Sequence, residues 1–214
     1  MKHLNELFDN MDSWRHLPAY QLERRADIFF SIYLPDLLFG KFGIQVEAML
    51  PEFPIRKGTI GTKSDDNRSD KIDYLIKVKD ANRVVFVELK TDDSSRRSEQ
   101  DSYLEMARQV GFNRLLDGVR EIYKATSSKR KYRHLLRNLH DMGFITLEGD
   151  SAFRVTQVVY DIQIVYIQPH NHASQAEVIS FQEAAQIISQ HRDELSLRFA
   201  QSLLEWADVR AGEK

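Results

Sequence analysis

Three residues near the middle of the chain combine the charges that hydrolysis of a phosphodiester bond requires. Asp73 and Glu88 supply two carboxylates, and Lys90 supplies an ammonium group. Two carboxylates can share Mg²⁺, which keeps several waters and accepts phosphate oxygens. The ion lowers the pKa of a bound water and neutralises charge that develops on phosphate. A neighbouring ammonium group can orient the attacking water or stabilise the transition state.

The two apolar segments that carry these residues, 71–79 and 83–90, predict a β-hairpin. If residues 81–82 form a two-residue loop, Asp80 pairs with Arg83. A one-residue slip would set the apolar residues of one strand against the charged residues of the other, so this register is favoured. In this register one face is wholly apolar and consists of Tyr74, Ile76, Val78, Val85, Val87 and Leu89.

The three candidate residues fall together on the other face of this hairpin. Asp73 is expected opposite Lys90, and Glu88 on the diagonal from Asp73, at about 7 Å between backbones. Carboxylates at that spacing can share one divalent cation. The alternative is a solvated, salt-bridged strand surface with no catalytic role.

The segments Lys-Ile-Asp-Tyr-Leu-Ile (71–76) and Val-Val-Phe-Val-Glu-Leu-Lys (84–90) resemble the PD-(D/E)XK nuclease superfamily, with Ile72 where many members have proline. The resemblance implies a core of helix, three-stranded meander, helix and strand. It implies that Asp73 and Glu88 bind Mg²⁺, for which Mn²⁺ is expected to substitute, and that Lys90 assists the attacking water. Some relatives keep this fold and lose activity.

Two further residues become site candidates through the resemblance. Such families often add a carboxylate from the first helix, and Glu23 is in line with the apolar stripe of that helix. The alternative is a rim residue paired with Arg24 or another neighbour. Some members carry Gln-x-x-x-Tyr after the lysine, whereas this chain has the shorter Gln100-Asp-Ser-Tyr103. Gln100 either reaches the site or is a polar residue of a first helical turn.

The expected fold class is α/β, with a mixed β-sheet flanked by helices, a restriction-endonuclease-like core (α-β-β-β-α-β) and a C-terminal helix. The expected domains are an N-terminal lead-in (1–17), a nuclease-like domain (18–168) with a helix–hairpin insertion (about 128–155), and a C-terminal helix packed on the core (169–214).

Proline and glycine set the expected boundaries of the first elements. A helix over 18–34 should end or restart at Pro35, because proline fits a first turn but not a helix interior. A strand over 44–50 should be closed by Pro51 and Pro54.

Later boundaries follow from similar signals. Helical sequence over 95–125 should break at Gly111, and a hairpin should turn near Gly149. Ser180 and Glu183 have the spacing of a capping box, which predicts the start of the C-terminal helix.

A basic segment follows the predicted nuclease motifs. Residues 120–140 contain seven lysines and arginines against one acid. On a helix, a basic row opposite an apolar stripe can bind phosphates. The alternative is a solubilising helix face. The candidate nucleic-acid-binding residues are Lys129, Arg130, Lys131, Arg133 and Arg137.

Composition limits which kinds of chemistry, partner and location remain possible. The 214 residues are 42% hydrophobic and 29% charged, with no cysteine, which excludes disulfides and thiol catalysis. The net charge of −2 gives no overall support for a polyanion partner. No apolar run is long enough for a membrane span, and a cytoplasmic location is expected.

These features together predict a metal-dependent nuclease that acts on DNA rather than RNA. A homodimer would suit double-strand cleavage. One alternative is an inactive protein of the same fold that binds nucleic acid or protein. Another is an unrelated α/β interaction domain.

Overall fold

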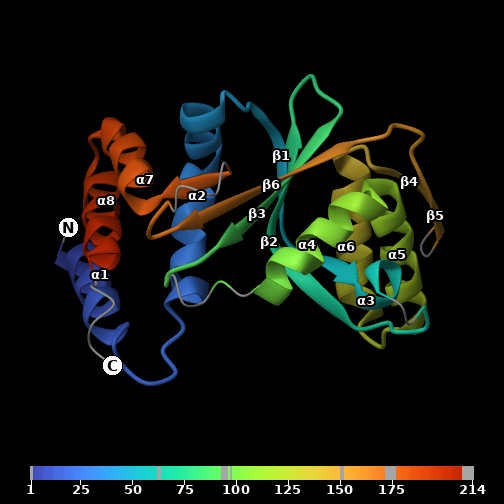
Figure 1. Cartoon of the computed structure of the whole chain (residues 1–214), viewed down its shortest axis with the longest axis horizontal. Coiled ribbons are helices and arrows are strands. Elements are labelled where there is room, and N and C mark those ends of the chain that lie inside the picture. Colours follow the sequence, from blue (N-terminus) through green and yellow to red (C-terminus); the bar gives the residue numbers. More distant parts are fainter. Residues whose placement is uncertain are drawn as a thin grey trace. The chain divides into compact units, whose positions relative to one another are not determined.

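The computed structural model describes residues 2–61, 64–92, 96, 98–149, 152–171 and 177–208. These residues form an α/β fold with a five-stranded mixed sheet in the order β1-β2-β3-β6-β7 and a separate β4–β5 hairpin (Figure 1). The strands are β1 (Val46–Arg56), β2 (Ser69–Val78), β3 (Arg83–Leu89), β4 (Ile145–Glu148), β5 (Ala152–Val155), β6 (Asp161–Gln168) and β7 (Val178–Ser180). The helices are α1 (Lys2–Trp14), α2 (Leu22–Phe42), α3 (Lys57–Ile60), α4 (Ser98–Val110), α5 (Phe112–Ala125), α6 (Lys129–Asp141), α7 (Phe181–Ile188) and α8 (Glu194–Ala207).

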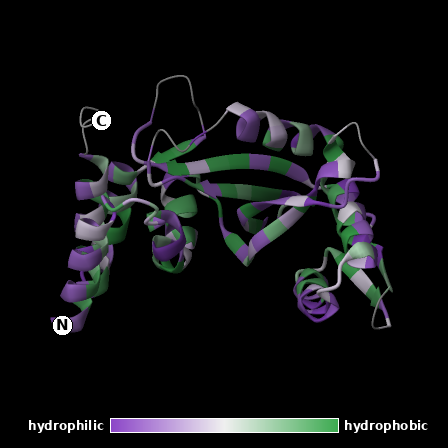
Figure 2. Ribbon diagram, turned by 90° about the horizontal axis from the view of Figure 1, so that it is seen from below, coloured by the Kyte–Doolittle hydropathy of each residue, from purple (hydrophilic) through white to green (hydrophobic). Residues whose placement is uncertain are grey.

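The sheet is mixed because its strands pair in both senses. β1 with β2 and β2 with β3 are antiparallel, whereas β6 with β7 is parallel. The N–H of Asp161 donates to the carbonyl of Asn82, and that of Lys90 to the carbonyl of Ile167, so β3 and β6 run in the same direction. From Val84 to Leu89 every residue of β3 is buried, and the central strands are mainly apolar in Figure 2. The expected mixed sheet is confirmed.

Backbone contacts divide the chain into two compact units. The first unit comprises Met1–Gln45, Leu89–Arg96 and Val165–Lys214, and the second comprises Val46–Glu88 and Arg97–Ile164. The core of the first unit includes aromatic side chains from α1, α2 and α8, and that of the second includes aromatic side chains from β1, β3 and α5. The first set contains Phe8, Phe29, Phe30, Phe199 and Trp206, and the second contains Phe53, Phe86, Phe112, Phe144 and Tyr160.

The prediction that a helix ends or restarts at Pro35 is wrong. α2 begins later than expected, at Leu22, and continues through Pro35 to Phe42. Proline removes one backbone hydrogen bond, but Leu34, Leu37 and Leu38 are fully buried and hold the next turns in place. Gly43 ends the helix with a left-handed φ of 68°.

The strand predicted to close at two prolines also continues. β1 runs to Arg56, and Pro51 and Pro54 pair with Tyr74 and Lys71. Among the described strands, β1 is the first in the sheet order, so it has a strand neighbour on one side only. An edge strand tolerates residues without an N–H group, because half of its donors have no strand to reach.

The C-terminal region also differs from the single helix that was expected. β7 precedes α7, and a 3₁₀ turn (Ser189–His191) separates α7 from α8. Arg192 has a left-handed φ of 60°, which reverses the chain before α8 begins. The capping box at Ser180 and Glu183 is confirmed, since both reciprocal hydrogen bonds are present. The predicted break at Gly111 is confirmed as well, with α4 ending at Val110 and α5 beginning at Phe112.

Candidate active site

The register of the β2–β3 hairpin is shifted by two residues from the one predicted. Tyr74 pairs with Val87 and Lys77 with Val84. The strands are joined by residues 79–82 rather than by a two-residue loop, and Asp80 in this connection has a φ of 54°. A longer loop moves the pairing, but a shift of two preserves which side chains share a face. The predicted division into two faces therefore holds, although the predicted opposition of Asp73 and Lys90 is wrong.

The observed register brings the two candidate carboxylates into closer correspondence. Beyond the pair Tyr74–Val87, the next positions along the two strands are Asp73 and Glu88. Directly opposed side chains have Cβ atoms about 4.5–5.5 Å apart, whereas diagonal neighbours are about 7–8 Å apart. The paired positions end at Tyr74–Val87, and continuing them by one position would place Asp73 opposite Glu88 rather than on its diagonal.

Glu88 is a buried carboxylate. Only 1% of its surface is exposed, and the amide of Gln100 on α4 donates a 2.5 Å hydrogen bond to its Oε2 atom. A buried charge must be compensated by hydrogen bonds, an opposite charge or a metal. The solvated-surface alternative therefore does not apply to Glu88. Gln100 therefore contacts this carboxylate, which is the first of the two alternatives that the sequence left open.

Tyr103 is a neighbour of Glu88 that the candidate set did not include. It is on α4, one turn after Gln100, and its buried hydroxyl has no hydrogen-bond partner among the described residues. Burial, together with the charges of Asp70 and Glu88, raises the pKa of this phenol well above its ordinary value. The i, i+3 spacing from Gln100 was the available signal, because residues at that spacing share a helix face.

Lys90 and Glu23 form an ion pair in the first unit. The ammonium of Lys90 lies 3.8 Å from Oε2 of Glu23 and donates a 2.7 Å hydrogen bond to the carbonyl of Leu89. Lys90 is only 5% exposed, so its charge needs such partners. Glu23 thus pairs with another candidate residue, and this contact fits both the site role and the rim alternative that the sequence left open.

The carboxylates of the second unit suit a hard cation. In the part of the chain that the structure describes, no group of three or more His, Cys, Asp or Glu residues is arranged to hold a metal ion. Mg²⁺ does not need an all-protein cage, since one or two carboxylates commonly hold it together with waters and substrate phosphates. Asp73 and Glu88 offer a donor set of that kind, with Gln100 hydrogen-bonded to one of them.

The basic segment forms α6, where its residues fall into two groups. Lys129 donates hydrogen bonds to the carbonyls of Tyr123 and Lys124 at the end of α5, so its charge serves that helix terminus. The other four candidate residues are exposed and make no ion pair or side-chain hydrogen bond with any described residue. They are Arg130, Lys131, Arg133 and Arg137.

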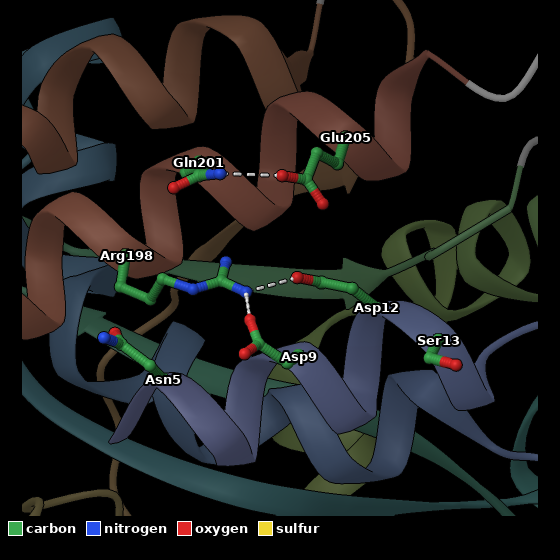
Figure 3. Close-up of a pocket in the computed structure, with 7 residues that line it drawn as sticks. All are labelled: Asn5, Asp9, Asp12, Ser13, Arg198, Gln201 and Glu205. Atoms are coloured by element: carbon green, nitrogen blue, oxygen red, sulfur yellow. Dashed lines mark hydrogen bonds and ion pairs between the residues drawn. The ribbon is translucent and has the colours of Figure 1, made fainter. Parts of the chain in front are cut away.

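A polar hollow of about 510 Å³ lies between α1 and α8 in the first unit (Figure 3). Its central Arg198 is held by Asp9 and Asp12, at 2.7 Å from each. None of the candidate catalytic residues lines it. The lining consists of Asn5, Asp9, Asp12, Ser13, Arg198, Gln201 and Glu205.

No described helix is both long and apolar enough to cross a lipid bilayer. Comparisons with known proteins assign no family to the chain: no protein-family model, curated protein or solved structure matches it.

Proposed function

We propose that this protein is a metal-dependent nuclease that hydrolyses phosphodiester bonds, in DNA rather than RNA, on a restriction-endonuclease-like core. The observation that carries the proposal is the position of Asp73 and Glu88, which follow the pair Tyr74–Val87 on two neighbouring strands. The burial of Glu88 and its hydrogen bond from Gln100 support a role beyond a solvated surface.

Each residue has a role that its chemistry suits. Asp73 and Glu88 would hold Mg²⁺, and Gln100 would keep the Glu88 carboxylate in one orientation. When bound, Mg²⁺ supplies a water of lowered pKa and neutralises charge on the phosphate. Lys90 follows Glu88 by two residues along the chain, and the resemblance implies that its ammonium would orient the attacking water.

The test is cleavage of plasmid, linear, single-stranded and branched DNA in Mg²⁺, Mn²⁺ or EDTA. Asp73→Asn and Lys90→Ala are each expected to lower the rate by roughly a hundredfold or more, the usual loss for a group that stabilises the transition state. Asp80→Asn is the matched control: it makes the same chemical change in the hairpin connection, where asparagine tolerates the positive φ. Cleavage that persists in EDTA or in Asp73→Asn would contradict the proposal.

A second measurement separates metal binding from turnover. Mg²⁺ that binds only the folded protein raises its melting temperature, and this rise should disappear in Asp73→Asn but not in Asp80→Asn. Absence of both cleavage and the metal-dependent rise, with salt-sensitive DNA binding retained, would favour the inactive, nucleic-acid-binding alternative. The exposed basic side chains of α6 are the observation that favours this second function.

A further inference from the structure

α6 carries an exposed row of arginines that the described structure does not use internally. Arg130, Arg133 and Arg137 are spaced i, i+3 and i+7, which places them along one face of the helix. All three are exposed and make no ion pair or side-chain hydrogen bond with any residue that the structure describes. The opposite face buries Leu136 and Leu139. The row thus leaves its charges free for a partner.

Other basic residues of the same unit behave differently. Arg108 pairs with Glu105 at 2.8 Å, and Lys124 pairs with Glu121 at 2.9 Å. Arg154 on β5 likewise lies 2.7 Å from Glu148 on β4. Most basic residues of this unit outside α6 pair locally in this way, with Lys79 and Arg114 as exposed exceptions among the described residues. α6 departs from this pattern, with five lysines and arginines and a single acid in its sequence KRKYRHLLRNLHD.

The position of the charges along α6 also argues against a role in helix stability. Lys129, Arg130 and Lys131 occupy its first turn, which contains no acidic residue. Cations near a helix N-terminus oppose the helix dipole and so disfavour the helix. Lys129 avoids this by reaching back to the carbonyls at the end of α5. The other two have no such compensation in the described structure, so a partner with negative charge would relieve them.

α6 is held firmly within the second unit. Burial raises the pKa of the Tyr132 phenol on α6 overall, and Ser69, the first residue of β2, lies close enough to this phenol to lower that pKa. β4 packs against α6, and residues 126–128 alone connect α5 to it. Ser69 precedes Asp73 by four residues on the same strand, which is about 13 Å along an extended chain. The helix that carries the basic row therefore lies beside the start of β2, the strand that carries the candidate metal ligand Asp73.

We propose that the exposed face of α6 binds duplex DNA, with Arg130, Arg133 and Arg137 contacting its phosphates. Two helices joined by a three-residue turn and followed by the β4–β5 hairpin have the order of a helix-turn-helix with a wing. The major groove of B-form DNA admits an α-helix, whereas that of A-form RNA is too deep and narrow. The inference deepens the proposed function. It rests on that function only for the cleavage that would follow binding, and not for the binding itself.

Binding is measured in EDTA, so that cleavage plays no part. A labelled DNA duplex is compared with its single strand and with duplex RNA over a range of salt concentrations. The triple variant Arg130→Ala, Arg133→Ala, Arg137→Ala should bind duplex DNA roughly tenfold or more weakly, and its log–log salt slope should fall by about 3, since each phosphate contact contributes nearly one unit.

The matched control removes the same charge from the same unit. It is the triple variant Arg108→Ala, Lys124→Ala, Arg154→Ala, in which each changed residue normally pairs with an acid. This control should keep the affinity and salt slope of the unmodified protein. Equal losses in both variants, or tighter binding of single strands or duplex RNA, would overturn the proposal, as would no binding by the unmodified protein.

A cross-link on an otherwise unaltered surface guards against misfolding of the triple variant. The chain has no cysteine, so Arg133→Cys and Lys124→Cys each create a single thiol. Duplex DNA with a thiol-reactive phosphate analogue should react with the first and not with the second. Reaction of both or neither would count against the α6 surface.

The two proposals fail separately. Duplex binding through α6 without Mg²⁺-dependent cleavage would refute the nuclease and leave this inference standing. Cleavage that needs Asp73 but is unchanged in the α6 triple variant would support the nuclease and refute DNA binding through α6.

Discussion

The side-chain amide of Gln100 donates a 2.5 Å hydrogen bond to the buried carboxylate of Glu88. This contact joins the first turn of α4 to the end of β3, two elements that the chain connects through a polar segment. The bond gives this buried carboxylate a donor and so offsets part of the cost of removing its charge from water.

Gln100→Ala should destabilise the protein by about 1.5–3 kcal/mol, the usual range for a hydrogen bond to a charged group. The loss follows because a buried carboxylate would give up a donor. Urea unfolding measures it. Gln109→Ala is the control on the same helix, since Gln109 is exposed and makes only a 3.4 Å contact with Glu105. Equal effects of the two changes would show that the Glu88 contact contributes nothing.

Tyr103→Phe should leave stability unchanged or raise it by about 1 kcal/mol, because a buried hydroxyl without a partner carries a desolvation cost. Tyr33→Phe is the counterpart, and it should lose about 0.5–1.5 kcal/mol with its 2.8 Å hydrogen bond to Ser196. Thermal and urea unfolding of both variants test the contrast. If Tyr103→Phe is instead the more destabilising change, the hydroxyl has a partner that the described residues do not provide.

Glu183→Gln should destabilise the protein at neutral pH by up to about 1 kcal/mol, because glutamine can still close the capping box but cannot form the ion pair with Lys41. Burial alone would raise the pKa of this carboxyl, but hydrogen bonds from Lys41 and Ser180 outweigh it and lower the pKa below its ordinary value. A lowered pKa in the folded state stabilises the protein above the unfolded pKa of about 4.3, and this contribution is lost as the pH falls through the folded pKa.

The difference in free energy of unfolding between Glu183→Gln and the unmodified protein should therefore shrink as the pH falls below about 4. Unfolding measured from pH 7 to pH 3 tests this. Glu194→Gln, in the first turn of α8, is the control and should show a smaller and flatter difference. A gap that stays constant over this range would contradict the role of ionised Glu183.

Arg198→Ala should destabilise the first unit by about 3–5 kcal/mol, because it leaves the largely buried Asp12 without its ion pair. Asp12 also accepts a 2.7 Å hydrogen bond from Trp206, so the loss should loosen α1 on α8. Figure 3 shows Arg198 between Asp9 and Asp12. Faster proteolysis within residues 2–14 would report the release of α1.

Gln201→Ala provides the comparison for this change. Gln201 lies on the same helix and bonds only to Glu205, one turn away on α8 (Figure 3). It should change the free energy of unfolding by less than about 0.5 kcal/mol. A similar rate of proteolysis in both variants would rule out Arg198 as the link between the helices.

Sequence alone determined the features that depend on neighbours along the chain. Hydrophobic alternation predicted β2 and β3 and the division of their side chains between two faces, because strand periodicity is local. Gly111 and the pair Ser180–Glu183 marked helix boundaries correctly, since the left-handed conformation and capping box are also local. The candidate carboxylates are therefore identifiable from the order of residues along two short segments.

Tertiary structure decided what depends on distant partners. The hairpin register shifted by two residues because the connection spans residues 79–82, and pairing with β1 and β6 fixes both strands independently of the turn. α2 passes through Pro35 because burial of its next turn outweighs one missing hydrogen bond. The hydrogen bond from Gln100 to Glu88 and the ion pair of Lys90 with Glu23 join segments that only folding brings together, and no local periodicity encodes them.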